Sequence, residues 1–72
     1  MPDEPRLLDV VALVQDLPER RLARGQIGTI VEKLEPHVFE VEFADRQGRP
    51  YAMLALRAEQ LMVLHDSPVE AV

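Results

Sequence analysis

Side chains that act as nucleophiles or metal ligands are scarce in this 72-residue chain. It has no cysteine, Ser67 is its one serine, and its two histidines, His37 and His65, lie far apart in the sequence. Zinc sites need several Cys, His or carboxylate ligands at characteristic spacings, and a catalytic triad needs a hydroxyl or thiol beside a base. The sequence therefore predicts a protein that is not an enzyme, with no catalytic, metal-binding or cofactor-binding residues.

Two glutamates and two glycines have spacings that also occur in functional sites. Glu40 and Glu42 could form an acid–base pair, but on a strand both point to the same side, here toward water, where they keep the surface soluble. Gly25 and Gly28 lack the longer glycine spacing, the Lys and the Ser or Thr of a phosphate-binding loop. We expect these glycines to permit a bend or bulge at the entrance to a strand.

Arg20, Arg21 and Arg24 form a local basic cluster. Guanidinium groups make bidentate contacts with carboxylates and phosphates, so this segment is a candidate partner-binding site. The alternative is that the arginines are only solvent-exposed residues of a loop that pair intermittently with Asp16 and Glu19. The whole chain has 13 acidic and 8 basic side chains, a net charge of −5. This charge repels phosphate backbones and argues against nucleic acid as a partner.

A second set of candidate partner-binding residues is apolar. The strand faces opposite the predicted core are expected to carry Met53, Met62, Leu64, Val11 and Leu13. Tyr51 is also a candidate, since it is the one aromatic residue that is not assigned to the core. One tyrosine is too little for an aromatic groove that binds proline-rich peptides. An exposed apolar patch of this kind indicates a protein interface.

The elements that position these residues are mostly strands. In residues 38–43, valine and phenylalanine alternate with glutamate, the period of two that buries one face of a strand. An Asp- and Gly-containing turn follows it, and a segment rich in β-branched residues precedes it. We expect strands over 28–34, 38–43, 51–56 and 61–64, a hairpin turn over 44–49 and a single 3-10 turn over 57–60.

The first apolar segment, residues 7–14, fits two structures. Its apolar residues match the spacing of an amphipathic helix, but its three valines and the following Pro18 favour a strand. A fifth strand would also cover an exposed edge of the sheet, which a short helix would not. We therefore expect a strand here and keep the helix as the alternative.

One domain is expected over residues 7–65, between disordered tails at 1–6 and 66–72 that lack an apolar repeat. No apolar run approaches the roughly 20 residues of a membrane span. The lack of cysteine and of an export signal favours a cytoplasmic location. A chain this short buries only about 60% of the surface that its unfolded form exposes, so self-association or a partner would help to stabilise it.

The succession of elements looks like the small SH3-like barrel, and four blocks of sequence resemble one family more narrowly. The blocks are residues 8–13 (LDVVAL), 16–19 (DLPE), 25–31 (GQIGTIV) and 39–43 (FEVEF). They are similar to a small bacterial family of domains of unknown function, the one numbered four-nine-two-six. This resemblance implies an all-β fold, a five-stranded SH3-like barrel with a 3-10 turn before the last strand, and it brings no catalytic residues.

A looser similarity is to the KOW-type modules that contact RNA or protein, in Gly25, Gly28, Ile30 and Glu32. The observations together favour a non-enzymatic protein–protein interaction or small regulatory module in a bacterium. Its partner would be an unidentified protein or a second copy, with no small-molecule substrate. Two alternatives stay open: an RNA- or DNA-contacting module that uses the arginine cluster, and an accessory domain of an enzyme complex.

Overall fold

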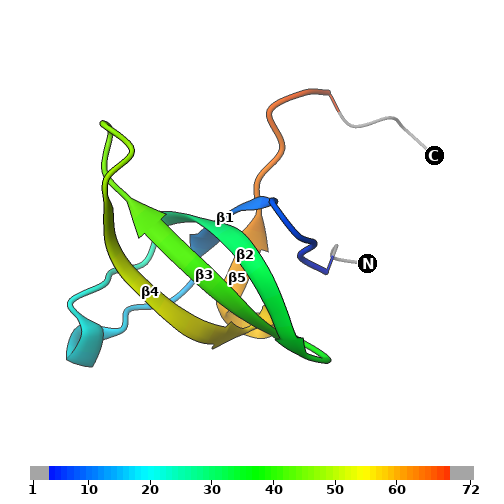
Figure 1. Cartoon of the computed structure of the whole chain (residues 1–72), viewed down its shortest axis with the longest axis horizontal. Helices are drawn as coiled ribbons and strands as arrows, with labels where there is room; N and C mark the ends of the chain where they lie inside the picture. The colour runs from blue at the N-terminus through cyan, green and yellow to red at the C-terminus, as the bar shows by residue number, and fades with distance from the viewer. Residues whose placement is uncertain (1–3, 69–72) are drawn as a thin grey trace.

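Five strands and two 3-10 turns make up the computed structural model, which describes residues 4–68 (Figure 1). The strands are β1 (Val10–Leu13), β2 (Ile27–Glu35), β3 (Val38–Ala44), β4 (Pro50–Arg57) and β5 (Leu61–Val63), and the turns are η1 (Pro18–Arg20) and η2 (Ala58–Gln60). The fold is all-β, as the sequence predicts, and the 3-10 turn η2 directly precedes the last strand.

The strands form one antiparallel sheet in the order β4-β3-β2-β1-β5. The sheet coils so that β3 and β4 lie in front in Figure 1, β1 and β5 lie behind them, and the long strand β2 takes part in both layers. We call the outer surface of β2, β3 and β4 the front face, and the outer surface of β2, β1 and β5 the back face. This topology is compatible with the predicted SH3-like barrel.

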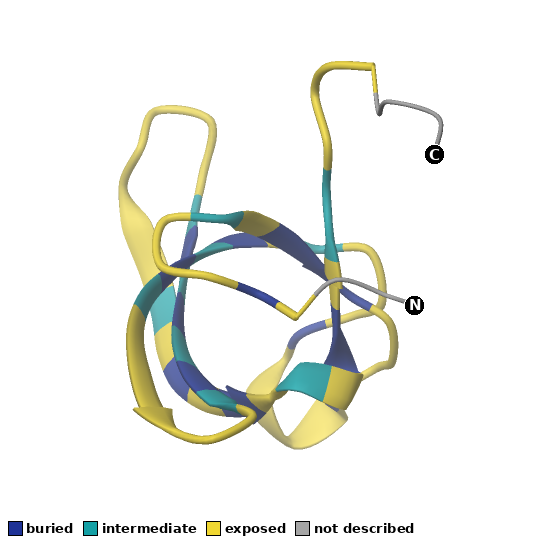
Figure 2. Cartoon of the chain, turned by 90° about the vertical axis from the view of Figure 1, so that its right-hand side faces the viewer, coloured by how far each residue is buried: buried dark blue, intermediate teal, exposed yellow. Residues whose placement is uncertain are grey.

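Apolar side chains fill the space between the two layers, where the buried segments of Figure 2 face one another. The inward side chains of β3 are the aromatic and branched residues that the alternating pattern predicted. The side chains that are less than 2% exposed are Phe39, Phe43, Leu13, Ile30, Val11 and Val41.

The first strand faces the opposite way from the sequence-based expectation. Val11 and Leu13 are 0% and 1% exposed and belong to the core, so the prediction that they lie on the outer face was wrong. Val10 and Ala12 point outward instead. The apolar run in this segment has no alternation that distinguishes the two faces. The register with β2 and β5, which places Ala12 opposite Ile27, therefore decides which residues are buried.

A turn over residues 6–9 shortens this strand from the expected 7–14. The Arg6 amide donates a hydrogen bond of 2.8 Å to Asp9 Oδ2, and the Asp9 amide donates one of 3.0 Å to the Arg6 carbonyl. The segment after this turn is a strand, so the strand is confirmed over the helix. Leu7 and Leu8 occupy the tip of the turn, where both side chains are exposed.

The ends of the described chain keep some contacts with the sheet. Pro5 is buried, and Glu4 Oε1 lies 3.1 Å from His37 Nδ1 in the turn between β2 and β3. The disordered tails predicted over 1–6 and 66–72 fall partly on residues 1–3 and 69–72, which lie outside the described residues.

Strand β2 approaches β3 most closely at Gly28. A Cβ atom there would lie 2.7 Å from Val41 Cγ1 and 3.0 Å from the Glu42 carbonyl oxygen, so only glycine fits. Gly25, in the turn before β2, has a φ of 94°, which glycine adopts without strain. The register shifts of β2 come after residue 30, beyond both glycines. The glycines therefore permit a turn and a close approach, and the bulges lie elsewhere.

Candidate functional site

Two rows of outward side chains cross the back face. In the first row, Ala12 on β1 lies opposite Ile27 on β2 and Met62 on β5. Ala12 is buried, at 6% exposed, although it is not part of the core cluster. The register places the larger Ile27 and Met62 on either side of it. The row is therefore low in the middle and raised at both sides.

The second row lies one residue pair further along the strands. Val10 is opposite Thr29 on β2, and the Val10 carbonyl accepts a hydrogen bond of 2.9 Å from the Leu64 amide, which places Leu64 beside it. Val14 follows β1 at one end of the face, and Leu8 precedes it at the other end. We call these residues the back-face patch: Leu8, Val10, Ala12, Val14, Ile27, Thr29, Met62 and Leu64.

None of the patch residues is charged, although charged residues make up 29% of the chain. Nine large apolar side chains are exposed within residues 4–68, and five of them belong to the back-face patch. These five are Leu8, Val10, Val14, Ile27 and Met62. Isolated exposed apolar residues are normal on protein surfaces, whereas a contiguous, charge-free group of them is a candidate interaction site.

A hollow of about 570 Å³ opens at one end of the patch. Three patch residues line it, namely Leu8, Val10 and Leu64, and Asp9, His65 and Asp66 complete its wall. The hollow therefore combines apolar side chains with two carboxylates and an imidazole.

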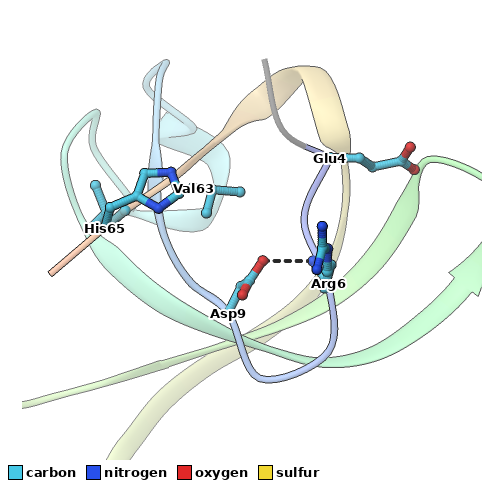
Figure 3. A pocket seen from close by; sticks show the side chains of 6 residues that line it. Glu4, Arg6, Asp9, Val63 and His65 are labelled. Carbon is cyan, nitrogen blue, oxygen red and sulfur yellow. Dashed lines mark hydrogen bonds between the residues drawn. The ribbon is translucent and has the colours of Figure 1, made fainter. Parts of the chain in front are cut away.

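A second hollow, of about 200 Å³, lies beside the first and shares Asp9, Leu64 and His65 with it. Figure 3 shows Val63 and His65 on one side of it and Arg6 on the other, with the hydrogen bond between Arg6 and the Asp9 carboxylate below. Acidic, basic and imidazole groups all line this smaller hollow. It extends the patch with a polar border.

Leu8 holds a conformation that is costly for its residue type. Its φ of 71° lies in the left-handed region, and its side chain is 73% exposed. The left-handed region costs a residue with a Cβ atom about 1–2 kcal/mol. The Leu8 amide donates a hydrogen bond of 2.8 Å to the Ile30 carbonyl, which fixes the residue to β2.

The structure brings together only some of the apolar residues that the sequence suggests. Met62 and Leu64 share the back face. Met53 lies on β4, opposite Glu42 on the front face, so it belongs to a different surface although it is also exposed.

Tyr51 lies at the base of the hairpin between β3 and β4. Its hydroxyl accepts a hydrogen bond of 3.0 Å from Gln26 Nε2, and its ring centroid is 6.4 Å from that of Phe43. Tyr51 therefore links the hairpin to the end of the loop over residues 14–26 and lies outside the back-face patch.

The arginine cluster lies on the loop between β1 and β2. Buried Leu17 and Leu22 anchor this loop to the core, and the three arginines are exposed. The Arg24 amide donates to Asp16 Oδ1 at 2.9 Å. Within residues 4–68, the guanidinium groups of Arg20, Arg21 and Arg24 form no ion pair. They are available to an anionic group, on the loop that connects the patch residues Val14 and Ile27.

Sequence reasoning missed Leu8, Val10, Val14 and Ile27 as surface residues. Ile27 could have been found from the alternation along its strand, because the next residue, Gly28, takes the inward position. The signal for Val10 was ambiguous, because every residue from 10 to 14 is apolar. Only the pairing of β1 with both neighbours identifies its outward residues.

Within the described residues, no group of three or more His, Cys, Asp or Glu side chains could hold a metal ion. Between residues 4 and 68, no helix has the length and apolar character needed to cross a membrane.

The strand order and the 3-10 turn before β5 define a small, five-stranded all-β domain, which is compatible with the SH3-like type. The sequence matches the family model described as "Domain of unknown function (DUF4926)" over residues 7–63. The chain belongs to that family, as its sequence blocks suggested. Neither a search of curated proteins nor a search of solved structures found a match.

Proposed function

We propose that this chain is a non-enzymatic protein–protein interaction module whose contact surface is the back-face patch. The observation that carries the proposal is the absence of charge at all eight patch residues, in a chain with a charged fraction of 29%. The core of a protein interface is likewise depleted of charged residues. The hollow at the Leu8 end provides a place for an inserted side chain of the partner.

The size of the patch supports the same proposal. Fully burying an aliphatic side chain removes about 100 Å² of apolar surface from water, so the five exposed residues offer roughly 300 Å². The largest apolar patch on a typical monomer is about 300–600 Å² and is often functional.

Capture of partners with matched variants tests the proposal. Met62 and Met53 are 52% and 48% exposed and lie on the back and front faces respectively. The immobilised chain, incubated with a lysate of the organism that encodes it, should retain one or more proteins. Met62→Lys should reduce this retention at least tenfold, because a charge in the centre of an interface must be desolvated. Met53→Lys should retain the same proteins as the unaltered chain.

Two results would contradict the proposal: no retained protein at all, not even a second copy of the chain, or equal retention by Met62→Lys and Met53→Lys. We further infer that the module acts in a reducing compartment such as the cytoplasm, because it has no cysteine. An accessory domain of an enzyme complex would use the same face, and the identity of a retained protein distinguishes that role.

A second candidate function is contact with RNA or DNA through Arg20, Arg21 and Arg24. The observation that favours it is the lack of an ion pair for these guanidinium groups in the described part of the chain, although Asp16 and Glu19 lie close in sequence. A titration with single- and double-stranded RNA and DNA at low salt tests it. Binding should weaken steeply with added salt and with the triple substitution to Ala. Absence of binding at low salt rejects it.

A further inference from the structure

We propose that the partner seated on the back-face patch is a second copy of this chain, so that the domain forms a weak, two-fold symmetric dimer. This inference rests on the proposed function and names the occupant of the same surface. In a two-fold dimer the same patch lies on both sides of the interface, so each residue near the axis faces its own neighbours. The surface must therefore be complementary to a copy of itself in both charge and shape.

The distribution of charge favours the back face for self-contact. The front face carries Glu40 and Glu42, and Glu32 on β2 lies directly opposite Glu40. Two copies that met there would bring carboxylates together, which is unfavourable. The eight residues of the back-face patch are uncharged. Their charged neighbours include Asp9 and Asp66, which line the hollow, and Glu42, which lies opposite Thr29 on β3. The back face thus allows a copy with the same net charge of −5 to approach.

The shape of the patch also allows it to pack against a copy of itself. Ala12 forms a low centre between Ile27 and Met62, and the hollow beside Val10 and Leu64 lies one residue pair further along. One face therefore carries both raised side chains and a recess of a size to receive them. Two such faces can interdigitate as stacked sheets do, at a separation of about 10 Å.

The area of the patch places the dimer at the small end of protein interfaces. A standard interface buries about 800 Å² per partner, of which about 65% is apolar in homodimers. The patch offers roughly 300 Å² of exposed apolar surface per copy, which is over half of that apolar share. Interfaces at this low end are weak and transient. We therefore expect a weak dimer whose dissociation constant lies in the sub-millimolar range that the experiment below covers.

Sedimentation equilibrium of the full chain from about 5 µM to 1 mM tests the inference. The average mass should rise from that of one chain toward that of two over this range. Met62→Lys should raise the dissociation constant at least tenfold, and Ile27→Lys, from the other side of Ala12, should do the same. The matched control Met53→Lys should dimerise like the unaltered chain. Thermal unfolding of each variant should show that the exposed lysines leave the fold intact.

The effect of salt separates a second copy from a basic partner. Since both copies are acidic and Asp9 and Asp66 line the hollow within the proposed interface, added NaCl should screen repulsion and strengthen the dimer. A partner attracted by these carboxylates would instead be released by salt. The inference is overturned if the chain stays monomeric at 1 mM, or if Met53→Lys weakens the dimer as much as Met62→Lys.

The two proposals fail in distinguishable ways. If the chain is monomeric but Met62→Lys captures less protein than the unaltered chain, the second copy is rejected as the occupant. The back face then remains an interaction surface for another protein. A monomeric chain with no effect of Met62→Lys on capture would reject both. A dimer dispersed by Met62→Lys, with no other captured protein, would show that the interaction module pairs with itself.

Discussion

At the scale of single residues, Gly28 shows how a residue without a side chain can determine packing. The backbone of β2 at this position lies against Val41 and the Glu42 carbonyl, and no space remains for a methyl group. The close approach joins the two layers of the sheet at the strand that they share. The sequence indicated an unusual backbone position here, but it could not indicate which atoms would come close.

Gly28→Ala should destabilise the domain by about 1–3 kcal/mol, because an added methyl group forces the core side chains and the backbone to shift. Urea unfolding followed by circular dichroism measures this loss. Gly48→Asn is the matched control, since Gly48 has a φ of 81° with open space around it and asparagine tolerates positive φ. The control should lose less than about 1 kcal/mol. Equal losses for the two variants would show that the close approach at Gly28 is unimportant.

At the scale of elements, β1 determines which surface of the domain is apolar. Its pairing with both β2 and β5 places Val11 in the core and Val10, its neighbour, in solvent. A shift of one residue would exchange the two sets and expose the core side chains.

Val11→Thr and Val10→Thr form a matched pair for this register, because threonine has nearly the shape of valine. At position 11, where valine is 0% exposed, the hydroxyl would be buried without a hydrogen-bond partner. The loss of stability should be about 1–3 kcal/mol. At position 10 the change should stay within about 0.5 kcal/mol. Chemical denaturation of both variants measures the difference. The opposite order would mean that β1 faces the other way.

Sequence patterns predicted the strands with clear alternation and left β1 uncertain for a physical reason. The alternation of phenylalanine and valine with glutamate fixed the inner face of β3, and the Asp- and Gly-containing turn fixed its hairpin with β4. The apolar run at 10–14 has no polar residue to mark the outer face. The back-face patch consequently emerged only from the pairing of strands that are distant in the sequence. Met62 and Leu64 were identified because β5 is short and its inward residue, Leu61, precedes them.

At the scale of the whole molecule, net charge describes the surface less well than the distribution of charge does. The front face carries glutamates, the loop over residues 14–26 carries the three exposed arginines, and the back face carries neither. A binding experiment on the whole domain therefore needs variants from each surface to identify where a partner sits.

The pairing of β1 with β5 brings the beginning and the end of the barrel together, since the Leu64 amide donates to the Val10 carbonyl at 2.9 Å. The barrel can therefore be cut and rejoined: a short flexible linker between its ends, with new ends opened at the exposed hairpin tip over residues 46–48, should give a circular permutant that still folds. Its circular dichroism spectrum and cooperative unfolding should match those of the parent. The same closeness means that the domain can be carried inside a loop of a host protein, as an insertion that hardly separates the two halves of the host.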